Sequence, residues 1–200
     1  DRYSIYDLEN DILQELGMKQ SVNHREYYIL DKYPSNCAII TKHPTIVFCI
    51  GSGHVANEKK YDSCALSLKS WPTQNWIDLG NLLVKRHYEV IFIGGTMEEG
   101  MIRPYLNKLD TRINNFIGKH SIKESLQVVR EADLVVGVDT GLIHGAAIQG
   151  TPTLTLFGCT DYIVEHPFGA HSYIINYSIE CSPCLGYDHS YTCTNNKCMQ

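Results

Sequence analysis

The sequence lacks both an excess of basic residues and an apolar run long enough to cross a membrane. Its 17 Lys and Arg against 22 Asp and Glu give a formal net charge of −5, which excludes the basic surface typical of nucleic-acid-binding proteins. The apolar run at residues 45–50 has the length of a β-strand. No internal repeat or low-complexity segment is visible. These absences, with 44% hydrophobic residues, favour an ordinary globular domain with no nucleic-acid partner.

The sequence also lacks an initiator methionine, so we expect a fragment or a processed chain. Its polar start, Asp1-Arg2-Tyr3, predicts that no signal peptide is present. Cysteine is not scarce, since there are eight, in two groups. Scattered thiols within core patterns favour a reducing compartment and hence a cytoplasmic location. The scattered cysteines are Cys37, Cys49, Cys64 and Cys159, whereas Cys181, Cys184, Cys193 and Cys198 crowd into the last twenty residues.

From residue 45 onward, strand patterns alternate with helix patterns, which predicts an α/β fold with a parallel sheet and right-handed crossovers. Before that point, residues 3–17 have the apolar spacing of a helix, and residues 27–30 have the pattern of a short strand. The later strands are predicted at residues 46–50, 88–93, 115–117, 134–138, 153–157 and 172–177. The later helices are predicted at residues 73–86, roughly 97–109, from 121 onward, and from 141 to 150.

The predicted helices carry apolar faces and recognisable ends. Residues 121–124 form a capping box, after which Ile122, Leu126 and Val129 are predicted to face inward. The helix from Gly141 is predicted to stop at a glycine that is soon followed by proline. The other predicted faces are Leu8, Ile12, Leu13 and Leu16 in residues 3–17, and Trp76, Leu79 and Leu83 in residues 73–86.

The most informative stretch is residues 135–147, in which an apolar strand runs into Asp139-Thr140-Gly141 and then His144 among small residues. A helix that starts at Gly141 would aim its N-terminus at this point, and such an end binds anions through unpaired N–H groups and the helix dipole. Small residues let the backbone approach a ligand closely. The stretch therefore predicts half of a phosphate-and-sugar binding site.

The predicted strands end in glycine or polar residues, and the carboxyl ends of parallel strands share one edge of a sheet. A nucleotide needs a cation for phosphate, a carboxylate for ribose and a flat contact for the base, which Lys69, Glu98 and His120 can supply. Asp139 would repel phosphate, so we expect it to accept hydrogen bonds from sugar hydroxyls. For any single loop, a simple turn explains the glycines equally well. The strand ends are residues 51–53, 94–98, 118–120, 139–141 and 158–161.

The ordered set of motifs resembles the lipopolysaccharide heptosyltransferases, glycosyltransferase family 9, over roughly residues 45–199. That resemblance implies a two-domain GT-B enzyme that transfers a sugar, typically heptose from ADP-heptose, to lipopolysaccharide core with inversion and without a metal. The motifs are Lys69-Ser70-Trp71-Pro72, Gly94-Gly95-Thr96-Met97-Glu98, Gly118-Lys119-His120-Ser121, Asp139-Thr140-Gly141-Leu142-Ile143-His144, Gly158-Cys159-Thr160-Asp161, and the tail Cys181-Ser182-Pro183-Cys184 through Cys193 and Cys198-Met199.

The resemblance also implies a division of the chain. Residues 1–44 correspond to an interdomain connecting segment with an N-terminal helix, and residues 45–178 to the nucleotide-sugar-binding domain. That domain is implied to be Rossmann-like, with helices on both faces of the sheet. Residues 179–200 form the Cys-rich tail. The N-terminal domain, which holds the acceptor and the general base, is implied to lie outside this chain, so no catalytic residue is assigned.

By the same resemblance, Lys69 contacts the donor diphosphate and sugar, Glu98 the ribose, and His120 lies near the base. The signature residues Asp139, Thr140, Gly141 and His144 hold the sugar and diphosphate. No cofactor is implied. The implied partners are a nucleotide-sugar donor and a glycolipid or glycan acceptor, with peripheral contact at the inner membrane as a further expectation. Two departures, Ser70 in place of a basic residue and a long loop at residues 51–69, leave the donor open.

Each candidate also has a purely structural explanation. Lys69 fits an ordinary surface lysine, and Glu98 fits an acid that favours a helix dipole. His120 fits a loop residue before a capping serine. His144 fits a hydrogen-bonded core histidine, and the tryptophans fit core packing.

Three other functions stay open. Gly51-Ser52-Gly53-His54-Val55-Ala56 fits the glycine pattern of an NAD-binding oxidoreductase, although a helix should then follow at once and the next strand should end in an acid about 20 residues on. Another GT-B nucleotide-sugar enzyme, such as an epimerase, is a second alternative. The third is a metal-stabilised interaction module, since the tail spacing Cys181-x2-Cys184-x8-Cys193-x4-Cys198 fits a structural zinc site, although it also fits disulfides or plain thiols.

Overall fold

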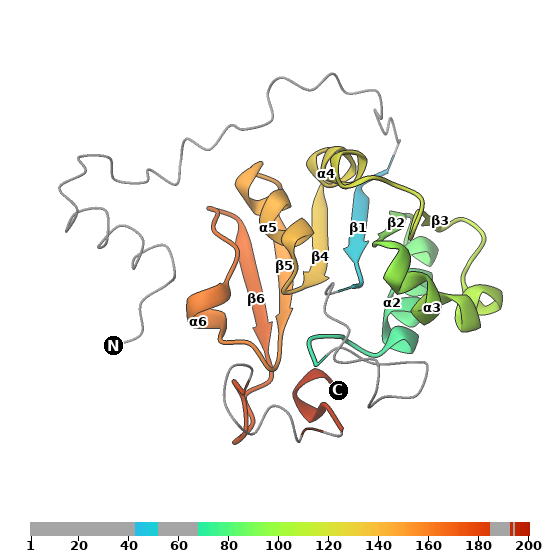
Figure 1. Ribbon diagram of the computed structural model, residues 1–200. Helices are drawn as coiled ribbons and strands as arrows, with labels where there is room; N and C mark the ends of the chain where they lie inside the picture. The colour runs from blue at the N-terminus through green and yellow to red at the C-terminus, as the bar shows by residue number, and fades with distance from the viewer. Residues whose placement is uncertain (1–42, 52–67, 185–192, 194) are drawn as a thin grey trace, which may run out of the picture.

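One parallel sheet of six strands organises the molecule (Figure 1). The computed structural model describes residues 43–51, 68–184, 193 and 195–200; the helix and strand predicted before residue 43 lie outside them. The strand order β3-β2-β1-β4-β5-β6 is that of a doubly wound nucleotide-binding fold, which confirms the predicted α/β class. The strands are β1 Thr45–Cys49, β2 Glu89–Ile93, β3 Asn114–Asn115, β4 Leu134–Val138, β5 Thr153–Phe157 and β6 Ser172–Asn176.

Helices cover both faces of the sheet, as the resemblance implied. Alternate residues of β1 point to opposite faces. On one face Phe48 packs in a cluster with Trp76 of α2, and on the other Val47 packs in a cluster with Val128 of α4 and Ile143 of α5. The α-helices are α2 Thr73–Lys85, α3 Glu99–Ile102, α4 Ile122–Arg130, α5 Gly141–Ile148 and α6 Tyr162–Glu165, and the 3-10 helices are η1 Thr96–Glu98, η2 Arg103–Lys108 and η4 Lys197–Met199.

Helix α2 confirms the predicted apolar face. Trp76 is fully buried, and its ring lies 5.2 Å from that of Phe48 and 4.9 Å from that of Trp71, centroid to centroid. Leu79 and Leu83 are partly buried against the same cluster. Both tryptophans therefore serve as packing residues, since aromatic pairs at this distance stabilise a core beyond the area that they bury.

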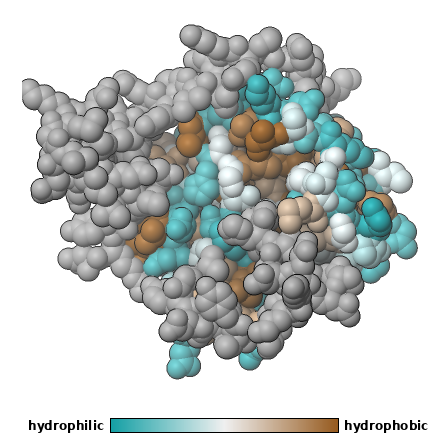
Figure 2. All heavy atoms as spheres, in the orientation of Figure 1, coloured by the Kyte–Doolittle hydropathy of each residue, from teal (hydrophilic) through white to brown (hydrophobic). Residues whose placement is uncertain are grey.

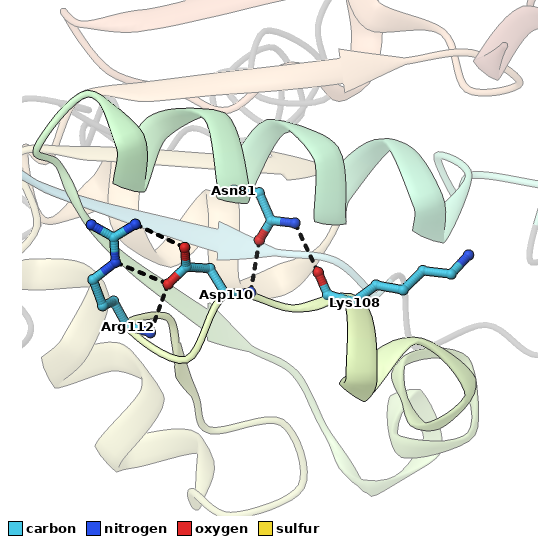
Figure 3. A network of polar contacts seen from close by, with 4 residues as sticks. All are labelled: Asn81, Lys108, Asp110 and Arg112. Carbon is cyan, nitrogen blue, oxygen red and sulfur yellow. Dashed lines mark hydrogen bonds and ion pairs between the residues drawn. The ribbon is translucent and has the colours of Figure 1, made fainter.

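A polar network fixes the segment before β3 to α2 (Figure 3). Asn81 donates to the carbonyl of Lys108 and accepts from the backbone N–H of Asp110, each at 2.8 Å. Arg112 donates to both carboxylate oxygens of Asp110, at 2.9 and 2.8 Å. This bidentate pairing is the main reason that the pKa of Asp110 is lowered to about 2.

Three expectations need correction. Residues 97–109 do not form one helix but η1, α3 and η2. Pro104 accounts for the end of α3, because it has no N–H to donate and its ring crowds the preceding turn. The third strand is Asn114–Asn115 rather than residues 115–117. The α4 capping box is confirmed, but Ile122 is 64% exposed, and the buried side of α4 is Ser125, Val128 and Val129.

No helix among the described residues combines the length and apolar character needed to cross a bilayer. Figure 2 shows small apolar patches separated by hydrophilic side chains over the coloured part of the surface.

Candidate functional site

The predicted site residues follow the carboxyl ends of strands, which point toward the edge of the sheet where the C-terminus lies (Figure 1). In doubly wound folds ligands bind at this edge, where the strand order reverses. Here the reversal lies at β1, which pairs with β2 on one side and β4 on the other. Gly51 follows β1, Glu98 follows β2 and Asp139 follows β4, so three residues of the predicted rim surround the reversal.

Asp139 is the centre of a charged cluster. Its Oδ2 lies 2.7 Å from the Nζ of Lys69, and its Oδ1 lies 3.2 Å from the Nε2 of His144. The Asp139 side chain is 7% exposed, against 16% for Lys69 and 24% for His144. The expectation that Lys69 and Asp139 share one edge is thereby confirmed, although 70 residues separate them in the sequence.

Opposing influences act on the Asp139 carboxyl group. Burial away from water raises its pKa, but hydrogen bonds from His144 and Lys69, with their charges, outweigh burial and hold the pKa below its ordinary value. Asp139 is therefore ionised at neutral pH. An ionised carboxylate only accepts hydrogen bonds, so Lys69 and the Nε2 of His144 are the donors.

The N-terminus of α5 opens beside this cluster. Thr140 is the N-cap residue in extended conformation, and within the described part of the chain its side chain makes no capping hydrogen bond. The N–H groups of Ile143 and His144 both donate to the Thr140 carbonyl, at 3.1 and 3.3 Å. A Cβ placed on Gly141 would meet nothing within 4 Å among the described residues. Gly141 is exposed in the described part of the chain, and the first N–H groups of a helix have no partner within the helix, so an anion could accept their hydrogen bonds here.

Glu98 lies against the end of β1. It is 7% exposed, and a Cβ placed on Gly51 would overlap its Cγ and its carboxylate. Glycine at residue 51 therefore makes the space that Glu98 occupies. Because η1 folds back over the end of β2, the carboxylate of Glu98 is held beside the strand-order reversal.

His120 provides a flat ring near the end of β2. It stacks on Phe116, with ring centroids 4.5 Å apart and an interplanar angle of 25°. Its Nδ1 is buried and has no hydrogen-bond partner within residues 43–51, 68–184, 193 and 195–200. The loop that carries it is joined to β2 by a 3.0 Å hydrogen bond from the N–H of Gly118 to the carbonyl of Gly94.

Sequence reasoning placed these residues on one rim but missed how they contact each other. It did not anticipate that Asp139 pairs directly with Lys69, although their opposite charges on a shared edge were a usable signal. It also missed Phe116 beneath His120 and the space that Gly51 leaves for Glu98, because neither depends on a motif.

The cysteines of the tail divide into buried and exposed thiols. Cys184 and Cys198 are buried with Cys159, whereas Cys181 is exposed. Among the residues that the structure describes, no three His, Cys, Asp or Glu side chains are placed to hold a metal ion. Cys181, Cys184, Cys193 and Cys198 all belong to that set, so the structure gives the structural zinc site no support.

The NAD-binding pattern finds little support. Among the described residues, the first helix after β1 is α2, which begins at Thr73, and β2 is followed by Gly94-Gly95 rather than by an acid. Residues 52–56 of the glycine pattern lie outside the described residues.

Comparison with known proteins gives a consistent family. A family model described as glycosyltransferase family 9 (heptosyltransferase) matches residues 6–195. Lipooligosaccharide heptosyltransferase 2 of Haemophilus influenzae is 25% identical over 150 residues, which cover 73% of this chain and 40% of that protein. The chain thus spans about two fifths of the length of this curated relative.

Solved structures agree on the fold. A glycosyl transferase family 9 protein from Veillonella parvula superposes with a TM-score of 0.67 at 20% identity, covering 88% of this chain and 49% of the other. The E. coli heptosyltransferase WaaC with ADP gives a TM-score of 0.52 at 25% identity, covering 66% of this chain and 37% of WaaC. WaaC with ADP-2-deoxy-2-fluoro heptose gives a TM-score of 0.51 at 25% identity, covering 68% of this chain and 38% of WaaC.

Proposed function

Because the chain belongs to glycosyltransferase family 9, the heptosyltransferases, we propose that it binds the nucleotide-diphospho-sugar donor for glycosyl transfer to lipopolysaccharide core or a related glycan. The observation that carries this proposal is the cluster of Lys69, Asp139 and His144 beside the N-terminus of α5. Residues 45–178 would form the donor-binding domain, residues 1–44 the connecting segment, and residues 179–200 the tail.

The cluster suits a diphosphate next to a sugar. The ammonium of Lys69 and the first N–H groups of α5, near Thr140 and Gly141, would receive the negative phosphate oxygens. Asp139 keeps the ammonium within 2.7 Å and retains lone pairs that can accept from sugar hydroxyls. His144 holds the other oxygen of Asp139 and so fixes the carboxylate.

The nucleoside would lie along the edge between β1 and β3. Glu98 has the acceptor oxygens that ribose hydroxyls require, and the Phe116–His120 stack offers an aromatic surface beside β2. We take the donor to be ADP-heptose, because the family model is described as heptosyltransferase and WaaC was solved with ADP and with a fluorinated ADP-heptose.

The proposed reaction is a single displacement with inversion at the anomeric carbon. An acceptor hydroxyl forms the new C–O bond as the bond to the diphosphate breaks, and negative charge grows on the leaving diphosphate. Lys69 and the α5 N–H groups are preorganised to stabilise that charge, so the proposal requires no metal ion. The general base that takes the hydroxyl proton would come from a domain outside this chain. Such an enzyme would work in the cytoplasm, at the inner membrane where its acceptor lies.

Donor binding tests the proposal directly. Calorimetric titration of the chain with ADP-heptose, UDP-sugars and GDP-sugars is expected to give the tightest binding with ADP-heptose. Lys69→Ala and Asp139→Ala are each expected to weaken that binding about tenfold or more, because a charge-assisted hydrogen bond is lost or misplaced.

Lys85→Ala is the matched control. Lys85 is exposed in the last turn of α2, just before β2 begins, so it lies at the opposite edge of the sheet. Its loss should leave binding unchanged. Unaltered affinity in both Lys69→Ala and Asp139→Ala, with the fold intact by circular dichroism, would refute the assignment.

A further inference from the structure

The C-terminal tail makes a direct contact with the segment that carries Lys69. The side-chain amide of Asn196 donates a 3.1 Å hydrogen bond to the backbone carbonyl of Ser70, across 126 residues of sequence. Ser70 is 1% exposed and immediately follows Lys69. The contact therefore lies next in the sequence to Lys69, whose ammonium group pairs with Asp139.

The tail is itself anchored to the end of β5. Cys198 and Met199 are 7% and 4% exposed, and a Cβ placed on Gly158 would overlap both of their side chains. The N–H of Cys184 donates to the carbonyl of Cys159 at 2.8 Å. In Figure 1 the red C-terminal helix η4 accordingly lies at the edge of the sheet toward which the strands point. Asn196 thus connects the end of β5 to the Lys69 segment.

Asparagine suits this position in two ways. Its backbone is left-handed, with φ 44° and ψ 44°, a conformation that asparagine tolerates better than most residues. Its amide also donates and accepts at once, since the Oδ1 of Asn196 accepts from the Sγ of Cys198 at 3.5 Å while the Nδ2 donates to Ser70. The side chain is therefore held from both sides.

We propose that Asn196 is a positioning residue for the donor site: by holding the Ser70 carbonyl, it fixes the backbone from which Lys69 reaches Asp139 and the donor diphosphate. Trp71 also supports this backbone, since its ring packs edge-on against Trp76. This inference rests on the proposed function, because it assigns Asn196 a role in binding the same donor. Through Asn196, the tail then becomes part of the donor site.

The test is a double-mutant cycle on ADP affinity, measured by calorimetry on the full chain. Asn196→Gly keeps a residue that accepts the left-handed backbone but removes the amide, and Asn196→Asp keeps the shape but removes the donor. Each is expected to weaken ADP binding about three- to tenfold, the effect of one misplaced hydrogen-bonding group. In a Lys69→Ala background, Asn196→Gly is expected to cause no further loss, because its effect acts through Lys69.

Asn195→Gly, at the exposed neighbouring asparagine, is the control for added backbone freedom and is expected to bind ADP as the unmodified chain does. The inference is overturned if Asn196→Gly matches Asn195→Gly, or if its loss multiplies that of Lys69→Ala, as a merely structural role predicts. If Asn196→Gly fails to fold, Asn196→Asp decides the matter by the same criteria. If Lys69→Ala itself binds ADP normally, the proposed function fails instead.

Discussion

At the residue scale, the chemistry depends on one carboxylate with two donors. Asp139 is buried and ionised because Lys69 and His144 each give it a hydrogen bond. Leaving such a carboxylate without a partner costs the desolvation that the pair had offset. The same pairing that prepares the site for a donor therefore also stabilises the fold around it.

This pairing gives a testable prediction for Lys69→Ala. One of the causes that lower the pKa of Asp139 is then lost while burial remains, so the pKa should rise, as measured by carbon NMR titration of the Asp139 carboxyl. The free energy of unfolding at pH 7 should fall by about 1–3 kcal/mol.

The pH dependence follows from the direction of that shift. A carboxyl whose pKa is lowered in the folded state stabilises the fold above its unfolded pKa, about 3.9, and this contribution is lost as the pH falls through the folded value. Denaturant unfolding should therefore show that the free energies of unfolding of the unmodified chain and of Lys69→Ala converge as the pH falls below about 4. Lys85→Ala should leave the Asp139 titration unchanged; an unchanged titration in Lys69→Ala would contradict the pairing.

At the element scale, close contact between backbone segments brings the site together. Strand β4 lies beside β1, and a Cβ placed on Gly137 would come within 2.9 Å of the Cβ of Cys49 and 3.1 Å of its carbonyl oxygen. Cys49 is 2% exposed, so neither strand has space into which to move. Residue 137 precedes Asp139 by two, and its contact helps to set the height of the carboxylate at the sheet edge.

We expect Gly137→Ala to lower the free energy of unfolding by about 1–3 kcal/mol, since overpacking a closed core forces the backbone to shift. Gly100→Ala is the matched control. A Cβ there would meet nothing within 4 Å among the described residues, and residue 100 lies in helix α3, where alanine is favoured over glycine. Urea unfolding should show a loss for the first and no loss for the second; equal midpoints would contradict the predicted packing of β1 against β4.

Many features of the individual helices and strands could be predicted from the sequence. The capping box at Ser121 and Glu124 is confirmed, because its two hydrogen bonds are local. On the predicted face of α4, Val129 is confirmed as buried and Leu126 packs against the core, but Ile122 is wrong because it is exposed. Only the neighbouring elements determine which side of a helix is covered. The helix expected through Pro104 was also wrong, although proline itself was a readable signal.

At the scale of the whole molecule, the tail packs against the end of β5, where Cys159 and the tail cysteines Cys184 and Cys198 are buried. Burial is the main reason that the pKa values of Cys159 and Cys198 are raised, to about 12 and about 11. A thiol with such a pKa is almost entirely protonated at pH 8 and nucleophilically inert. Cys181 belongs to the same tail but is exposed.

Thiol labelling should therefore be strongly selective. Brief treatment of the native protein with iodoacetamide at pH 8, followed by peptide mass mapping, should modify Cys181 much more than Cys159 or Cys198. All three should react equally after denaturation in urea, which is the internal control. Equal labelling of Cys159 in the native protein would mean that the tail does not cover the end of β5.

The sequence by itself determined the α/β class, the position of most strands and the set of residues at the strand ends. These depend on local periodicity and on the rule that parallel strands end at a common edge. Only the tertiary structure decided that Asp139 pairs with Lys69, that Gly51 makes room for Glu98, and that the tail reaches back to Ser70. These contacts join distant segments, and no local pattern sets the separation of two side chains that meet only when the whole sheet has assembled.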